Sequence, residues 1–153
     1  MPPKTPLVLA FDTAAAHCAA ALLSGDQILG EKSESLLKGQ AERLIPMLNE
    51  LLEGAGKDWA DLDAVVVGTG PGNFTGVRIS VSTARGLAVS LGIPAIGVST
   101  FEALAYGSEG GVRVSLDGRR EPLFWQEFED GVAVSDPVQQ PLAEVSSAAD
   151  GYI

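Results

Sequence analysis

Residues 65–78 read Val65-Val66-Val67-Gly68-Thr69-Gly70-Pro71-Gly72-Asn73-Phe74-Thr75-Gly76-Val77-Arg78, an apolar strand that leads through a glycine-dense loop into a helix. Glycines allow positive φ and the close approach of another backbone or a ligand, and Pro71 stiffens the turn between them. Thr75 is the predicted N-cap of a helix that runs from about residue 77 to residue 91. The free N–H groups of its first turn face whatever lies at the loop.

Two known phosphate-binding motifs do not fit this loop. A P-loop needs a lysine directly after its last glycine, and none follows Gly76. A dinucleotide fingerprint needs a third glycine where this loop has Asn73 or Thr75. The loop is therefore either a tight connection at which two backbones pack closely, or a contact for an anion or a partner.

Length and charge limit the classes of function. The 153 residues, 46% of them hydrophobic, suffice for one domain with a real core and are too few for two large ones. Ten Lys and Arg stand against 20 Asp and Glu, a formal net charge of −10. This charge repels a phosphate backbone, so we expect no extended direct contact with nucleic acid unless a partner supplies positive charge.

The chain has one histidine, His17, and one cysteine, Cys18. They are neighbours on a predicted strand and so point to opposite faces, which argues against a catalytic pair. A metal site built from His and Cys needs three or four ligands, so we expect no metal site and a buried Cys18. The N-terminus lacks a secretory pattern and no apolar run reaches the length of a membrane span, so we expect a cytoplasmic protein.

Hydrophobic periodicity and turn residues predict the secondary structure. Strands are predicted at residues 7–11, 17–23, 27–35, 64–67 and 93–98, and helices at 40–52, 77–91 and 100–106. A hairpin is predicted from residues 112–116 and 123–129, and residues 131–153 are predicted to be a weakly ordered tail. The first helix is expected to bury Ala41, Leu44, Ile45, Leu48 and Leu52.

The element order β-β-β-α-β-α-β suits a mixed five-stranded sheet with packed helices, as in ribonuclease-H-like and actin-like lobes. We expect this α/β lobe at residues 1–106 and a reduced C-terminal segment at 107–153. In that architecture the loop after the first strand approaches nucleotide phosphates. The candidate nucleotide contacts are Asp12, Thr13, Gly70 and Gly72. The alternative is that Asp12 and Thr13 form an Asx turn at the end of the strand.

Both helices carry candidate partner contacts. Ser82, Gly86 and Ser90 form a line of small residues at successive i+4 steps. Because a glycine inside a helix costs about 1 kcal/mol relative to alanine, we expect another helix to approach closely there. Arg43, Met47 and Glu50 are predicted to form the exposed face of the first helix, with Met47 as an adaptable contact among charges.

Several segments resemble the TsaB (YeaZ) family over roughly residues 7–129. The most specific is Gly70-Pro71-Gly72-Asn73-Phe74-Thr75-Gly76-Val77-Arg78, followed by Ala84-Arg85-Gly86-Leu87-Ala88. The chain departs from the family pattern in two places. It has Asp12-Thr13-Ala14 where Asp-Thr-Ser is common. Just before Glu42-Arg43 it has Gln40 and Ala41, where family members commonly have a histidine or polar residue followed by a serine.

The resemblance implies an actin-like two-lobed fold, with the second lobe largely missing here, and a role in threonylcarbamoyladenosine modification of tRNA. It implies a non-catalytic scaffold of the transferase TsaD, which TsaE joins, with a homodimer when alone, tRNA reached only through the complex, and no membrane. The implied interface is a bundle of the two helices, to which Arg78 and Arg85 also belong. ATP or ADP with magnesium at a partner interface is a candidate cofactor.

Two other classes of function stay open from the sequence. One is an ATP-dependent transferase or hydrolase of the actin-like superfamily, and the other is the M22 glycoprotease that older classifications name. In TsaD the metal is held largely by histidines on the first long helix, which here begins Gln40-Ala41-Glu42-Arg43 and contains none. We therefore predict no catalytic residues and no metal ligands in this chain.

Overall fold

The computed structural model describes residues 5–118 and 122–141, which fall into two units that divide after Val98. The first unit contains β1 (Leu7–Asp12), β2 (His17–Ser24), β3 (Gln27–Ser35), α1 (Gln40–Gly54), a 3₁₀ turn (Trp59–Asp61), β4 (Ala64–Gly68), α2 (Phe74–Leu91) and β5 (Ala95–Val98). The second contains α3 (Thr100–Ala105), β6 (Gly111–Asp117), β7 (Pro122–Glu129), β8 (Val132–Ala133) and β9 (Val138–Pro141).

The sheet of the first unit has five strands in the order β3-β2-β1-β4-β5. Strands β1, β2 and β3 form the predicted antiparallel meander, and β4 pairs in parallel with both β1 and β5. This mixed sheet confirms the predicted fold class. Because β1 and β4 are parallel, the loops that follow them leave from the same edge of the sheet.

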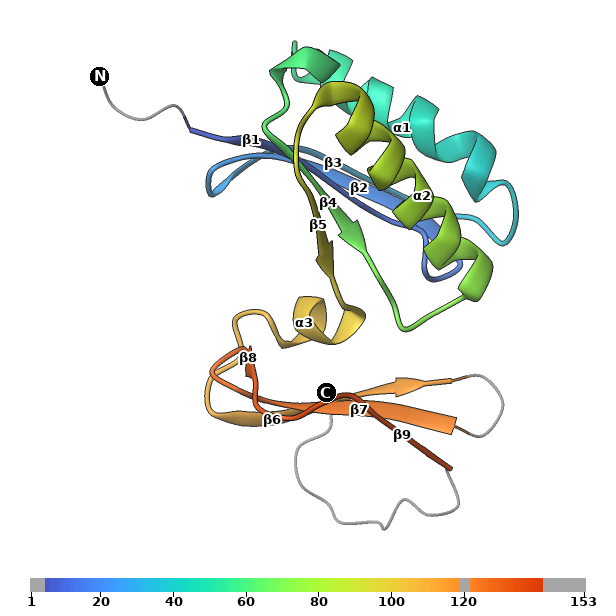
Figure 1. Ribbon diagram of the computed structural model, residues 1–153, viewed down its shortest axis with the longest axis vertical. Coiled ribbons are helices and arrows are strands. Elements are labelled where there is room, and N and C mark those ends of the chain that lie inside the picture. The colour runs from blue at the N-terminus through green and yellow to red at the C-terminus, as the bar shows by residue number, and fades with distance from the viewer. Residues whose placement is uncertain (1–4, 119–121, 142–153) are drawn as a thin grey trace. The chain divides into compact units, whose positions relative to one another are not determined.

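Helices α1 and α2 lie side by side over one face of this sheet (Figure 1). Alternate strand residues point toward them, so Leu9 of β1, Leu22 of β2 and Val65 of β4 are fully buried. Helix α1 contributes Leu44, Met47, Leu48, Leu51 and Leu52 to the same core.

One prediction about α1 is wrong. Met47, expected on the exposed face, is 0% exposed, whereas Ile45, expected in the core, is 44% exposed. The buried residues of α1 follow the i, i+3, i+4, i+7, i+8 spacing of a single stripe that starts at Leu44. Ala41 and Ile45, both exposed, lie along one side of this stripe, so periodicity alone left the centre of the stripe ambiguous.

The start of α2 also differs from the prediction. Asn73, not Thr75, is the N-cap: its side-chain oxygen accepts a hydrogen bond of 3.0 Å from the Gly76 N–H. The helix therefore begins at Phe74 and includes Thr75 in its first turn. It ends at Leu91, as predicted, because Gly92 takes the left-handed conformation with φ 67°.

In the second unit, α3 packs on the sheet formed by β6 and β7. Phe101 and Ala105 of α3 are buried with Val114 of β6 and Phe128 of β7. Helix α3 thus belongs to this unit, and the division lies after Val98 rather than after residue 106.

The predicted hairpin is confirmed by the antiparallel pairing of β6 with β7. Strands β8 and β9 both pair with β7, so the prediction of weak order is wrong for residues 132–133 and 138–141. Residues 142–153 of the predicted tail lie outside the described residues.

Candidate functional site

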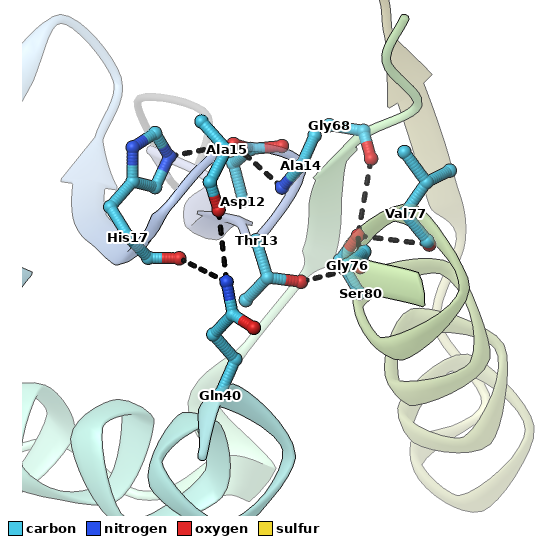
Figure 2. A network of polar contacts seen from close by, with 10 residues as sticks. All are labelled: Asp12, Thr13, Ala14, Ala15, His17, Gln40, Gly68, Gly76, Val77 and Ser80. Atoms are coloured by element: carbon cyan, nitrogen blue, oxygen red, sulfur yellow. Dashed lines mark hydrogen bonds and ion pairs between the residues drawn. The ribbon is translucent and has the colours of Figure 1, made fainter. Parts of the chain in front are cut away.

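The connection between β1 and β2 meets the glycine-dense loop before α2 (Figure 2). The Thr13 hydroxyl, 0% exposed, donates a hydrogen bond of 2.6 Å to the Gly76 carbonyl oxygen. The Asn73 N–H donates a hydrogen bond of 2.6 Å to the Ala14 carbonyl oxygen. Two segments far apart in the sequence are therefore joined backbone to backbone at the edge of the sheet.

The glycines of the loop make this close approach possible. A Cβ atom at Gly76 would overlap the Thr13 carbonyl oxygen, and one at Gly72 would overlap the backbone of Ala14. A Cβ atom at Gly68 would overlap the Asp12 carboxylate. Of the two interpretations of the loop, these contacts match close packing of two backbones.

Asp12 forms the turn that follows β1. Its Oδ2 atom accepts a hydrogen bond of 3.2 Å from the Ala14 N–H, which is the predicted Asx turn. The same atom lies 2.8 Å from Nε2 of His17, and the two side chains are 31% and 35% exposed. The Asp12–His17 pair was not predicted. A signal was available, because the short connection between two antiparallel strands keeps residues near its two ends close together.

Two of the four candidate nucleotide contacts, Thr13 and Gly70, are buried, whereas the Asp12 side chain is 31% exposed and Gly72 is exposed. The Thr13 hydroxyl is buried and donates within the chain. Gly70 is buried, and Gly72 lies against Ala14. Within residues 5–118 and 122–141, no group of three or more His, Cys, Asp or Glu side chains could hold a metal ion. Cys18 is fully buried, as predicted, and burial raises the pKa of its thiol.

The predicted interface residues Arg43 and Glu50 belong to an ion-pair network between α1 and β3. The Arg43 guanidinium donates to Glu34 at 2.7 Å and to Glu50 at 2.6 Å, and Lys32 also pairs with Glu50. Hydrogen bonds from Arg43 and then Lys32 hold the pKa of Glu50 at about 2. Hydrogen bonding to Arg43 also lowers the pKa of Glu34, while these two carboxylates raise the pKa of Arg43. This network ties α1 to the edge strand.

Arg78, Ser82, Arg85 and Gly86 all lie on the exposed side of α2. A Cβ atom added at Gly86 would meet no atom within 4 Å. Phe74 and Val89, at 68% and 85% exposed, lie on the same helix, and the Arg78 guanidinium stacks over the Phe74 ring at 4.0 Å. In the described part of the chain, nothing that α2 contacts explains why Gly86 is small.

Sequence reasoning missed one polar residue of α1. Gln40, its first residue, donates through Nε2 to the carbonyl oxygens of Ala15 at 2.9 Å and His17 at 3.4 Å. No spacing rule connects a helix start to a strand connection more than 20 residues earlier, so this contact had no local signal.

No helix in the described residues is long and apolar enough to cross a membrane.

Comparisons with known proteins agree with the motifs. The family model "TsaD: tRNA N6-adenosine threonylcarbamoyltransferase" matches residues 30–149. The Escherichia coli protein named tRNA threonylcarbamoyladenosine biosynthesis protein TsaB is 36% identical over 127 residues, which are 80% of this chain and 54% of that protein. The chain spans about half the length of the curated TsaB relatives that it matches.

Solved structures extend the likeness to the fold. YeaZ from Pseudomonas aeruginosa superposes with a TM-score of 0.80 at 32% identity, over 95% of this chain and 72% of that one. A ROK hexokinase from Thermus thermophilus, with a TM-score of 0.56 at 18% identity over 85% of this chain and 49% of that one, shares the actin-like fold alone. Sequence motifs, family model and solved structures agree, and this chain belongs to the TsaB (YeaZ) family.

Proposed function

We propose that this chain is a non-catalytic scaffold that binds and activates TsaD in the threonylcarbamoyladenosine modification of tRNA. The name of the Escherichia coli relative places that protein in this pathway. The family model that matches this chain is that of the transferase TsaD. Likeness to both proteins supports a role beside the transferase.

One observation carries the non-catalytic part of the proposal. At the loop where an actin-like fold would accept a phosphate, the Thr13 hydroxyl already donates to Gly76, and the Ala14 carbonyl oxygen already accepts from Asn73. A hydroxyl that is buried and already bonded cannot orient a substrate or a hydrated metal ion. This geometry supports a role in partner binding rather than in catalysis.

The proposed partner face is the exposed side of α2, next to the exposed side of α1. Exposed Gly86 and its small neighbours Ser82 and Ser90 let another helix approach closely. Arg78 and Arg85 give this face positive charge in a chain of net charge −10, which suits an acidic partner surface. In the absence of TsaD, the same face forms a homodimer.

The rest of the assembly follows from the same proposal. TsaE joins TsaD and this chain. The tRNA is contacted through the complex, because a net charge of −10 repels phosphates. We propose that an ATP or ADP site with magnesium lies at a partner interface, because the Thr13 hydroxyl already donates within the chain. We also propose a cytoplasmic location, which the proposed role in tRNA modification supports.

Reconstitution tests the function directly. We expect TsaD from the same organism to modify tRNA faster with this chain than without it. By calorimetry and turnover assays, we expect the isolated chain to bind no ATP with magnesium, to cleave no peptide and to retain no stoichiometric zinc after dialysis. ATP or peptide turnover by the isolated chain would establish one of the two enzymatic alternatives and overturn the scaffold role.

Two leucine variants test the face. Gly86→Leu places bulk at an open position on the exposed side of α2. Ser33→Leu places a leucine at an exposed position of β3; its neighbours Lys32 and Glu34 pair with α1, so Ser33 points to the other face of the sheet. We expect Gly86→Leu to be a folded monomer without TsaD binding, and Ser33→Leu to bind as wild type. If TsaD affinity and dimerisation survive Gly86→Leu, the interface lies elsewhere.

A further inference from the structure

The short connection after β1 holds the starts of both helices. Thr13 donates to Gly76 of α2, and the Ala14 carbonyl oxygen accepts from the Asn73 N–H at the N-cap of α2. The next carbonyl oxygen, that of Ala15, accepts from Nε2 of Gln40, the first residue of α1. Three consecutive residues thus anchor α2 and α1 at one point, and Figure 2 shows Gln40 reaching this point from α1.

Gln40 carries this anchor on the side of α1. The N-cap of α1 is Gly39, which makes no side-chain capping bond. The ion pairs of Arg43 and Glu50 run to β3 and not to the connection after β1. Among the described residues, the side-chain hydrogen bonds from α1 to this connection come from Gln40, which also donates to the His17 carbonyl oxygen.

We propose that Gln40 is a positioning residue for partner binding. By tying α1 to the connection that also holds α2, it sets where the exposed side of one helix stands relative to that of the other. This inference rests on the proposed function, in which the two helices bind TsaD. A partner that contacts both helices binds a preset pair more tightly, because less ordering is required on binding.

The contacts around Gln40 indicate that α1 folds without its hydrogen bonds, so a change at Gln40 affects the position of the helix and not its folding. The body of α1 is held by buried leucines and by Met47, which do not depend on Gln40. The bond to Ala15 is exposed, so water can replace it when it is lost. A carboxylate in the first turn is favourable to the helix dipole, so Gln40→Glu does not weaken α1 itself.

Three variants test the inference. Gln40→Glu keeps the shape of the side chain but places an acceptor against two carbonyl oxygens, while Gln40→Lys keeps a donor there. Gln27→Glu makes the same charge change at an exposed position at the start of β3. We expect Gln40→Glu to weaken TsaD binding about tenfold, the size of one hydrogen bond, with the urea midpoint unchanged. We expect Gln40→Lys and Gln27→Glu to bind as wild type.

Amide hydrogen exchange on the isolated chain adds a readout that needs no partner. The Arg43 N–H is bonded to the Gly39 carbonyl oxygen at the start of α1. We expect it to exchange faster in Gln40→Glu than in wild type or Gln27→Glu, because loss of the anchor lets the start of α1 open locally. Unchanged exchange, or a wild-type Kd for Gln40→Glu, overturns the inference and leaves the proposed function standing. Equal weakening by Gln27→Glu, or no recovery in Gln40→Lys, also overturns it. Failure of the wild-type chain to bind TsaD overturns the proposed function and this inference together.

Discussion

The Thr13 hydroxyl lies 2.6 Å from the Gly76 carbonyl oxygen and joins the end of β1 to the first turn of α2 across 63 positions of sequence. Gly76 also accepts from the Ser80 hydroxyl at 3.3 Å. These buried bonds close the loop after β1 against the helix. Thr13, at the end of a strand where the sequence suggests ligand binding, therefore has a structural role instead.

The Thr13 bond has a measurable effect on stability. Thr13→Val keeps the shape of the side chain and removes the donor, so we expect the free energy of unfolding to fall by about 1 kcal/mol. Urea denaturation measures this change. Thr75→Val, at an exposed position in the first turn of α2, is the matched control and should change stability by less than about 0.5 kcal/mol. Equal midpoints for Thr13→Val and wild type would contradict the role of the bond.

Two glycines of α2 should respond in opposite directions to the same substitution. In Gly76→Ala the new methyl group overlaps the Thr13 carbonyl oxygen, so we expect a loss of about 1 to 3 kcal/mol. In Gly86→Ala the methyl group enters open space in the monomer, so at concentrations at which the chain is monomeric we expect a gain of up to about 1 kcal/mol from helix propensity. Thermal or urea unfolding of dilute samples measures both changes. A Gly76→Ala variant as stable as wild type would contradict the packing described for Gly76.

The Arg43 network predicts a pH dependence of stability. Hydrogen bonds from Arg43 and then Lys32 hold the folded-state pKa of Glu50 at about 2, below its ordinary value of 4.5. A carboxylate with a lowered pKa stabilises the fold above its ordinary value and loses that effect as it becomes protonated. We therefore expect the free energy of unfolding to decline as the pH falls from about 4.5 toward about 2. Urea titrations across this window should show a shallower decline for Glu50→Gln; identical slopes would contradict the assignment.

The burial of Met47 and the exposure of Ile45, the reverse of what the sequence predicts, can be tested with one substitution at each. Met47→Asp buries a carboxylate without a partner, so we expect a loss of about 3 to 5 kcal/mol. Ile45→Asp should cost less than about 1 kcal/mol, because the side chain is already partly exposed. Circular dichroism with urea denaturation measures both. A stable Met47→Asp variant would show that Met47 faces solvent.

Local patterns were sufficient for most elements of the first unit. The alternation in β1 and β2, the turn at residues 24–26 and the glycine after Leu91 each act over a few residues, and each element lies close to where it was predicted. No local pattern indicated to which of the two units α3 belongs. Its six residues form a short amphipathic helix in either unit, and only the contact of Phe101 with the β6–β7 sheet assigned it to the second.

From sequence alone one could derive the mixed sheet, the burial of Cys18 and the small exposed line on α2, because strand alternation, side-chain polarity and helical spacing are short-range properties. Only the tertiary structure decided what packs against the glycine loop and which face of α1 is buried. A glycine at position 76 permits the close approach of any group, and in the folded chain that group is Thr13, which lies 63 residues earlier in the sequence. Likewise, Ile45 and Met47 differ little in hydrophobicity, so the position of the sheet beneath α1 selects which of them is buried.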